Sequence, residues 1–203
     1  MKLIENETEQ KLRGGFYTPE PLAKFILRWA VNGDMGYDIL EPSCGNGVFL
    51  EQIKTSEIKY NSITAIEVDA VEAEKAASVD LSNKVVLNED FHAFANVTEQ
   101  RFDLVVGNPP YIRYQYFDRE QQIEAAKIFQ KANLKYSKLT NAWVSFVVGS
   151  SLLLKEKGKI GFVLPAEILQ VSYAKTLRNF LSHYYNKINI VSFKKLVFPD
   201  IQQ

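Results

Sequence analysis

The stretch Asn108-Pro109-Pro110-Tyr111 is the first place in this sequence where residue types and spacing indicate chemistry. The apolar run 102–107 precedes it, and a buried strand must end there because paired prolines cannot continue a ladder of hydrogen bonds. The amide oxygen of Asn108 and the backbone carbonyl of Pro109 can each accept one hydrogen of an exocyclic amine. Two acceptors on a stiff loop would stabilise the charge that develops on that nitrogen as it attacks an electrophile. Tyr111 offers a ring face for a planar base. The alternative interpretation is an ordinary turn.

A second candidate site is the glycine turn at residues 41–47, between a predicted strand and a predicted helix. Gly45 and Gly47 allow the backbone to approach a ligand closely. A dinucleotide site would want a third glycine where Leu50 stands, facing a diphosphate at the helix N-terminus. Glu41 instead brings a carboxylate to the turn, and a carboxylate suits the cationic amino-acid end of S-adenosylmethionine better than it suits a diphosphate.

Two further acidic residues follow the next predicted strands. Glu67 lies 20 residues after Gly47 and can accept both hydroxyls of an adenosine ribose. Asp90 can accept from an adenine amino group, and Phe91 supplies a ring to lie beside that base. Singly, these residues could be a surface carboxylate, a turn residue and a core ring. Together, at three successive strand ends, they predict that S-adenosylmethionine is the cofactor.

The elements that must position these residues alternate between strands and helices. Strands are expected at 37–41, 62–68, 84–87, 102–107, 159–164 and 188–193. Helices are expected from about residue 48, at 70–79, around 121–131, and at 142–154 and 167–184; another begins after Thr18 as N-cap, with Pro19 as its first residue. This alternation predicts an α/β fold with a mostly parallel sheet and helices on both faces. Ligands of such sheets bind beyond the carboxyl ends of the strands, where the candidate residues fall.

Composition limits the classes to which the chain can belong. With 203 residues and 46% hydrophobic side chains, it is long enough for one α/β domain. Cys44 is the only cysteine, which excludes an internal disulfide and a cysteine-based metal cage. His92 and His183 are the only histidines and lie far apart in sequence, so no metal site is expected. The chain shows neither a signal segment nor an apolar run that could span a bilayer, so we expect a soluble intracellular protein.

Charge is distributed unevenly although the net charge is zero. Residues 1–100 carry 17 acidic and 9 basic side chains, whereas residues 101–203 carry 7 acidic and 15 basic ones. A basic half favours contact with the phosphates of a nucleic acid. Two solvated surfaces of opposite sign are the alternative interpretation.

These motifs together resemble those of amino-methyltransferases that act on adenine in DNA. Residues 108–111 resemble the catalytic motif of that family, and residues 41–47 resemble its cofactor motif. The stretch from Arg13 to Pro19 resembles a further cofactor motif. Its place before the glycine turn is typical of the gamma arrangement, found in type IIG restriction–modification enzymes and type I modification subunits. Residues 141–143 and 158–165 resemble later family segments, so the resemblance covers nearly the whole chain.

The resemblance implies a Rossmann-like class I S-adenosylmethionine-dependent methyltransferase fold over residues 1–203, with an N-terminal helical segment at 1–36. It implies methylation of adenine N6 in double-stranded DNA, within a restriction–modification or related system in the prokaryotic cytoplasm. The target adenine must be flipped out of the duplex, and Tyr111 and Phe198 are expected on its two faces, although Phe198 could equally cap the core. The expected cofactor-binding residues are Tyr17, Thr18, Glu41, Ser43, Cys44, Gly45, Gly47, Glu67, Val68, Asp90, Phe91 and Asn108.

Family members continue well beyond this length. The resemblance therefore implies that a seventh strand and a C-terminal target-recognition domain, or a separate specificity subunit, are missing from these 203 residues. We expect the chain alone to bind S-adenosylmethionine but to methylate DNA weakly or not at all.

Two other functions remain open from the sequence. Methyltransferases acting on protein glutamine also use Asn-Pro-Pro-Tyr, although the segment 16–19 argues against that substrate. A non-catalytic scaffold in a restriction complex is the second alternative, and the intact Asn108 and Glu67 argue against it. Cytosine C5 methylation is disfavoured because it needs a cysteine in the catalytic loop, and Cys44 lies elsewhere.

Overall fold

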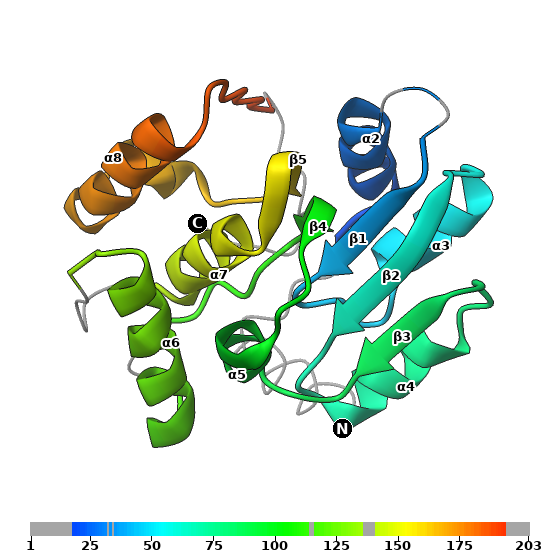
Figure 1. Cartoon of the computed structure of the whole chain (residues 1–203), viewed down its shortest axis with the longest axis horizontal. Helices are drawn as coiled ribbons and strands as arrows, with labels where there is room; N and C mark the ends of the chain where they lie inside the picture. Colours follow the sequence, from blue (N-terminus) through cyan, green and yellow to red (C-terminus); the bar gives the residue numbers. More distant parts are fainter. Residues whose placement is uncertain (1–17, 32, 34, 114–115, 136–140, 194–203) are drawn as a thin grey trace, which may run out of the picture.

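A parallel sheet of five strands lies at the centre of the computed structural model, which describes residues 18–31, 33, 35–113, 116–135 and 141–193 (Figure 1). Its strands lie in the order β3-β2-β1-β4-β5, and all neighbours are parallel. Their bounds are β1 Tyr37–Glu41, β2 Tyr60–Ile66, β3 Lys84–Leu87, β4 Phe102–Gly107 and β5 Leu154–Phe162. The expected parallel α/β sheet is confirmed.

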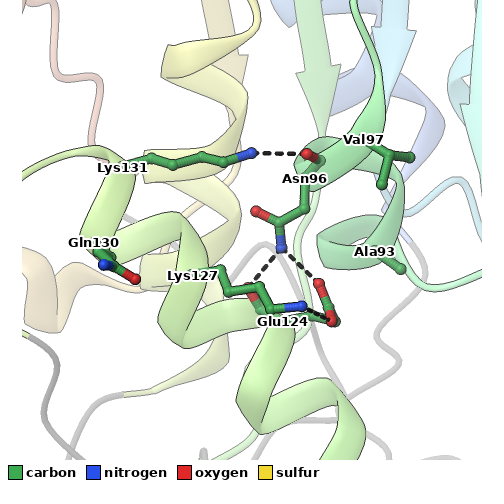
Figure 2. Close-up of a pocket in the computed structure, with 7 residues that line it drawn as sticks. All are labelled: Ala93, Asn96, Val97, Glu124, Lys127, Gln130 and Lys131. Atoms are coloured by element: carbon green, nitrogen blue, oxygen red, sulfur yellow. Dashed lines mark hydrogen bonds and ion pairs between the residues drawn. The ribbon is translucent and has the colours of Figure 1, made fainter.

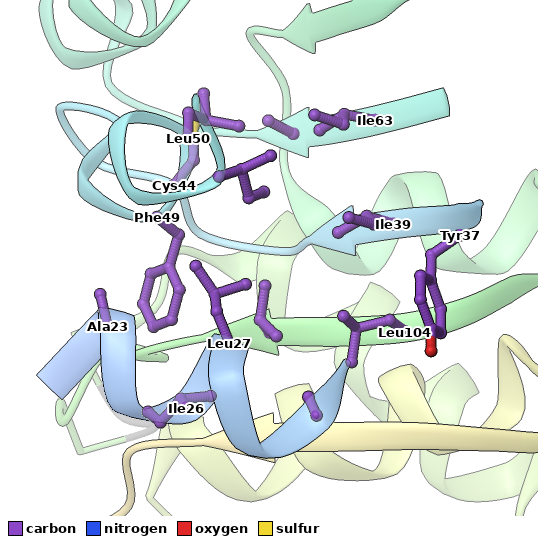
Figure 3. Packing of buried hydrophobic residues seen from close by; sticks show 14 of the residues in the cluster. Ala23, Ile26, Leu27, Tyr37, Ile39, Cys44, Phe49, Leu50, Ile63 and Leu104 are labelled. Carbon is purple, nitrogen blue, oxygen red and sulfur yellow. The ribbon is translucent and has the colours of Figure 1, made fainter. Parts of the chain in front are cut away.

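Helices cover both faces of this sheet, as expected. On one face lie α2 (Glu20–Ala30), α3 (Val48–Thr55) and α4 (Ala70–Ser78); on the other lie α5 (Phe91–Val97), α6 (Arg119–Lys131) and α7 (Ala142–Leu152) (Figure 1). The successive β1 residues Ile39 and Leu40 belong to opposite core clusters, because side chains alternate along a strand. Figure 3 shows the first cluster, where Leu27 of α2 and Phe49 of α3 lie side by side and Ile39 of β1 belongs to the same core.

The helix α7 lies inside the helical layer. Ten of its residues are buried, because the sheet, α6 and α8 (Lys175–Tyr184) pack around it. A helix that is apolar all round is expected where every face is covered. Within the described ranges, no helix combines the length and the apolar character needed to cross a membrane.

Aspartate side chains begin three helices. Asp69 and Asp90 accept hydrogen bonds from backbone N–H groups of α4 and α5, and Asp118 forms a capping box with Gln121 at the start of α6. Each cap satisfies N–H groups that no helical carbonyl can reach and stabilises the helix by about 1 kcal/mol. Two of these caps lie just beyond the ends of β2 and β3, so helix starts and strand ends share one edge.

Residues 188–193, expected as a sixth strand, do not form one. No described strand pairs with them. Four of their side chains remain 49–65% exposed, namely those of Ile188, Ile190, Val191 and Phe193. A strand needs a neighbour for its N–H and C=O groups, so an apolar pattern alone does not produce one. This prediction was wrong.

The helix expected over 167–184 is interrupted. Two short 3₁₀ turns, Ala166–Leu169 and Ser172–Ala174, precede α8, and Val171 between them is extended with ψ 142°. The Arg178 guanidinium donates to the carbonyls of Ile168 and Val171, 2.8 and 3.1 Å away. A side chain thus satisfies backbone groups that an unbroken helix would satisfy itself.

Other boundaries differ more modestly. The strand expected from residue 159 begins at Leu154, and the helix expected to end at residue 154 ends at Leu152. The N-terminal helix starts at Glu20, with Pro19 rather than Thr18 as its N-cap, a one-residue shift. The short helix α5 was not predicted, because its seven residues carry too little periodicity to be recognised.

An ion cluster joins three strands at the edge where they begin. Lys155 Nζ of β5 lies 2.6 Å from Asp38 Oδ2 of β1 and 2.9 Å from Asp103 Oδ2 of β4. The backbone N–H of Asp38 donates to Asp103 at 2.9 Å, and the Ser62 hydroxyl donates to Asp38 at 2.7 Å. The hydrogen bond from Lys155, and then that from Ser62, lower the pKa of Asp38.

Replacing Lys155 with methionine is expected to lower the free energy of unfolding by about 1 kcal/mol near neutral pH, since both ion pairs are partly exposed. The lowered pKa of Asp38 means that its contribution is present above the usual value of 3.8 and is lost as pH falls through the folded value. Denaturant unfolding should therefore show a smaller difference in acid, and also in high salt. Lys157→Met, at an exposed position on the same strand, is the control. Equal losses in the two variants would contradict the prediction.

Candidate active site

The carboxyl ends of β1, β2, β3 and β4 meet at one edge, because these strands are parallel neighbours. Glu41 ends β1, Glu67 follows β2, Asp90 lies three residues after β3, and Asn108 follows β4. The structure therefore brings together the residues that the sequence placed at successive strand ends. Ligands of parallel α/β sheets bind at this edge.

The turn after β1 needs glycine at two positions. Gly45 has φ 52° and Gly47 has φ 90°, both in the left-handed region. A Cβ atom at Gly47 would also lie only 3.1 Å from Cα of Ala76 in α4. The N–H of Gly45 donates to Oε2 of Glu67 at 2.8 Å. The turn and the end of β2 are thus joined into one unit.

Glu41 is a buried carboxylate with an unsatisfied oxygen. Its side chain is 2% exposed, and Oε2 has no hydrogen-bond partner among the described residues. Burial, and then the nearby charge of Glu67, raise the pKa of Glu41 well above its usual value. A cationic or donor group of a ligand would satisfy this oxygen and favour the ionised form.

Glu67 already accepts two backbone hydrogen bonds. Beside the bond from Gly45, its Oε1 accepts from the N–H of Asp69 at 3.0 Å. Burial raises the pKa of Glu67, and these two bonds oppose the increase. Each carboxylate oxygen has a second lone pair, so Glu67 can still accept from ligand hydroxyls. The amide of Asn88 donates to the carbonyls of Glu67 and Val68 at 2.9 and 3.0 Å, which holds the strand end in place.

Asp90 and Phe91 have different surroundings. Asp90 Oδ1 accepts from two N–H groups of the first turn of α5, and Gln121 Nε2 lies 3.3 Å from its Oδ2. The Asp90 side chain stays 20% exposed, which leaves it accessible to a ligand. Phe91 is 2% exposed, and its ring stacks on Phe146 with centroids 4.9 Å apart. The ring belongs to the core here, and its expected contact with a cofactor base stays a prediction.

The loop from Asn108 to Tyr111 is held by side chains and by the end of β5. The Tyr111 hydroxyl forms a hydrogen bond with Oδ1 of Asn108 and lies 3.0 Å from the carbonyl of Val163. The Ser43 hydroxyl lies 3.4 Å from the carbonyl of Asn108, which connects the glycine turn to this loop. Burial raises the pKa of Tyr111, so its hydroxyl remains a protonated donor. The predicted acceptor at Asn108 therefore has an internal partner in this structure.

The remaining predicted residues are placed less uniformly. Thr18 is buried, whereas Val68 is 61% exposed. In the catalytic loop, Pro109 is buried and Pro110 is partly exposed. Tyr17 and Phe198 lie outside the described residues, so their predicted roles stay predictions.

Cys44 does not have the properties of a nucleophile. Its side chain is buried, and burial, followed by the charges of Glu41 and Glu67, raises the pKa of the thiol. A reactive cysteine needs a lowered pKa, since the thiolate is the attacking form. Among the described residues, no three His, Cys, Asp or Glu side chains form a group that could hold a metal ion.

Two residues that hold this edge were not predicted from the sequence. Asn88 is polar and follows a predicted strand, and this signal could have identified it. Gln121 lies 31 residues from Asp90, so local sequence gives no sign of their contact.

A groove of about 390 Å³ lies between α5 and α6, away from the strand ends (Figure 2). Its lining consists of Ala93, Asn96, Val97, Glu124, Lys127, Gln130 and Lys131. None of these is a predicted site residue. The charged lining groups bond to one another or to backbone: Lys127 pairs with Glu124, and Lys131 donates to the Asn96 carbonyl (Figure 2). The charged side chains that line this groove therefore have partners within the protein, and we do not assign the chemistry to it.

Known proteins are similar to this chain in sequence and in fold. A family model described as Eco57I restriction-modification methylase matches residues 21–198. The type II methyltransferase M.AccI of Acinetobacter calcoaceticus is 28% identical over 189 residues, which cover 91% of this chain and 34% of that protein. A tRNA1(Val) (adenine(37)-N6)-methyltransferase of Haemophilus influenzae is 30% identical over 136 residues, which cover 64% of this chain and 54% of that enzyme.

A solved structure described as a class I S-adenosylmethionine-dependent methyltransferase, from Listeria monocytogenes, superposes with a TM-score of 0.66 at 19% identity. It matches 82% of this chain and 51% of that protein, and confirms the expected fold. The chain spans about a third of the length of the type II methyltransferase that it matches. The fold and the matching family together support S-adenosylmethionine as the cofactor.

Proposed function

Because this chain belongs to the Eco57I restriction-modification methylase family, we propose that the protein transfers a methyl group from S-adenosylmethionine to the N6 amine of a flipped-out adenine in DNA. One observation carries the proposal. A buried carboxylate with an unsatisfied oxygen, Glu41, lies at the same sheet edge as the Asn108 loop. A site for a cation and a pair of acceptors for an amine thus share one edge.

The residues at this edge fit the cofactor. S-adenosylmethionine, when bound, supplies an electrophilic methyl group on a sulfonium and carries a cationic amino-acid end. Glu41 offers an unpaired acceptor for that end, and Glu67 retains lone pairs for ribose hydroxyls. Asp90, partly exposed, is an acceptor for an adenine amino group. The positive φ of Gly45 and Gly47 lets the chain turn beside these groups without side-chain bulk.

The catalytic loop contributes acceptors rather than a base. As the target nitrogen loses its conjugation with the ring, Asn108 Oδ1 and the Pro109 carbonyl accept hydrogen bonds from its two N–H groups and stabilise the developing positive charge. One of these protons is released to solvent after the transfer, which leaves the methylated amine neutral. Asn108 can do so while Tyr111 remains bonded, since an amide oxygen has two lone pairs. The Tyr111 hydroxyl, whose one hydrogen can be donated to Asn108 Oδ1 or to the Val163 carbonyl, holds the loop beside the end of β5, so the acceptors are preorganised.

DNA is favoured as the substrate by the extent of the matches. The similarity to M.AccI covers 91% of the chain, whereas the similarity to the tRNA methyltransferase covers 64%. The tRNA enzyme's name specifies adenine N6, and this supports adenine as the base. RNA adenine is therefore the second candidate substrate. The basic second half suits either nucleic acid.

Transfer of labelled methyl from S-adenosylmethionine tests the proposal, with the protein at its natural length. Duplex DNA, transcribed tRNA and a glutamine-bearing release factor are offered in parallel, and digested DNA is analysed for N6-methyladenine. We expect label in N6-methyladenine of DNA alone. Label in tRNA or in the release factor, without label in DNA, would contradict the proposal and identify that molecule as the substrate. Cofactor binding without transfer to any of the three would favour the scaffold.

A further inference from the structure

A buried histidine lies behind Asp90 and takes no part in the chemistry described above. His92 is fully buried. Its Nδ1 lies 3.3 Å from both carboxylate oxygens of Asp90, and its Nε2 lies 2.8 Å from the hydroxyl of Ser145 in α7. The three side chains therefore form a chain of hydrogen bonds from the strand-end edge into the core.

Aromatic rings fix the orientation of this histidine. The Phe117 ring meets it edge-on at a centroid distance of 5.4 Å, and Phe146 does so at 4.8 Å. Phe91 lies tilted at 5.7 Å. Close packing on several sides leaves the imidazole little freedom to turn, so its nitrogens are held toward Asp90 and Ser145.

The partners of His92 show which of its ring nitrogens carries a proton toward Asp90. An ionised Asp90 only accepts, so the facing Nδ1 of His92 must carry a proton for the contact to be attractive. On the other side of the ring, Nε2 lies 2.8 Å from the Ser145 hydroxyl. That hydroxyl donates its single hydrogen to the carbonyl of Ala142 at 2.8 Å, which anchors Ser145 on α7. The anchored Ser145 hydroxyl thus helps to hold the imidazole with Nδ1 toward Asp90.

We propose that His92, supported by Ser145, is a positioning residue that orients the Asp90 carboxylate to accept the amino group of the cofactor's adenine. The inference rests on the proposed function, because that function assigns Asp90 to the cofactor. Backbone N–H groups hold Oδ1 of Asp90, whereas its Oδ2 meets only side chains among the described residues, those of His92 and Gln121. His92 is the nearly immobile one of these two, since it is fully buried.

The test measures preference for the amino group rather than affinity alone. Calorimetry compares binding of S-adenosylhomocysteine, which has the adenine amine, with binding of S-inosylhomocysteine, which has a carbonyl in its place. The unaltered chain should prefer the first by about 10- to 100-fold, the value of one hydrogen bond to a charged acceptor. Asp90→Asn should abolish most of that preference.

Four variants separate positioning from simple packing. His92→Leu keeps apolar bulk without a donor and should reduce the preference at least about fivefold, with little change in binding of the inosine compound. His92→Asn keeps a donor near Nδ1 and should restore part of the preference. Ser145→Ala removes the outer contact and should give an intermediate value; it decides the question if His92→Leu does not fold. Gln121→Ala, at a half-buried position in the first turn of α6, measures how much of the preference depends on the Gln121 contact with Oδ2.

The outcomes distinguish the two proposals. If Asp90→Asn removes the preference while His92→Leu and Ser145→Ala keep it in full, His92 only fills the core and the inference is wrong. If Asp90→Asn keeps the preference although both compounds bind, the assignment of Asp90 fails and this inference fails with it, whereas the rest of the cofactor site stands. If neither compound binds, the proposed function is refuted together with the role of His92.

Discussion

Replacing Asn108 with alanine is expected to lower the rate of methyl transfer by about 10²- to 10³-fold, the cost of removing one preorganised group that stabilises transition-state charge. The affinity for S-adenosylmethionine should change by less than about tenfold, because the proposed site assigns the charged contacts to Glu41 and Glu67. Single-turnover transfer of labelled methyl to duplex DNA by the protein at its natural length measures the rate, and calorimetry measures the affinity.

Two matched variants identify the cause of that loss. Asn108→Asp keeps an acceptor oxygen at the same place and should lose less activity than alanine. Tyr111→Phe keeps the ring but removes the hydroxyl that bonds to Asn108, so it reports what loop stiffening contributes. We expect a reduction of about tenfold or less for phenylalanine, since the acceptor itself remains. Full activity of Asn108→Ala would show that the amine is activated in another way.

The strand end before Asn108, the glycine turn and the shared edge were predicted correctly because local backbone rules decide them. Paired prolines after an apolar run must end a strand, and β4 ends at Gly107, directly before Asn108. The glycines at 45 and 47 mark a turn, and both adopt positive φ. Parallel strands then place all their carboxyl ends on one edge, so the convergence of Glu41, Glu67 and Asn108 follows from topology.

What could not be predicted depends on contacts between distant parts of the chain. The ring face expected of Tyr111 stays a prediction, but the contacts of its hydroxyl with Asn108 and with Val163, 52 residues later, were not predicted. His92 was considered only as a metal ligand, because nothing in the local sequence connects it to Ser145, 53 residues away. The apolar pattern at 188–193 suggested a strand, yet whether such a segment pairs depends on a neighbour that its own residues do not specify.

Glu41 shows that the site is built at a cost to the stability of the fold. A carboxylate that is 2% exposed and has one unsatisfied oxygen opposes folding in its charged form. Its raised pKa means that the protonated form favours the folded state, and that this contribution is lost as pH rises through the raised value. Under the proposed function, a cationic ligand would satisfy this oxygen. Stability and cofactor binding should therefore respond to Glu41 in opposite directions.

Replacing Glu41 with glutamine is accordingly expected to raise the melting temperature of the ligand-free chain by about 2–4 °C, which corresponds to roughly 1 kcal/mol for a chain of this size. The same change should weaken S-adenosylmethionine binding by about 10- to 100-fold, the loss of a hydrogen-bonded charge. Glu51→Gln, an exposed acid in α3, is the control and should alter neither property appreciably.

The pH dependence of binding gives an independent test of the same residue. A cation favours ionised Glu41, so affinity in the unaltered chain should increase as pH rises through the raised pKa, with release of a proton on binding. Calorimetry in buffers of different ionisation enthalpy counts that proton. Glu41→Gln should remove most of the proton release, and the remainder reports Glu67, whose pKa burial also raises. If the glutamine variant binds the cofactor as tightly as its parent and releases the same proton, the cationic end lies elsewhere, and the buried carboxylate serves the fold alone.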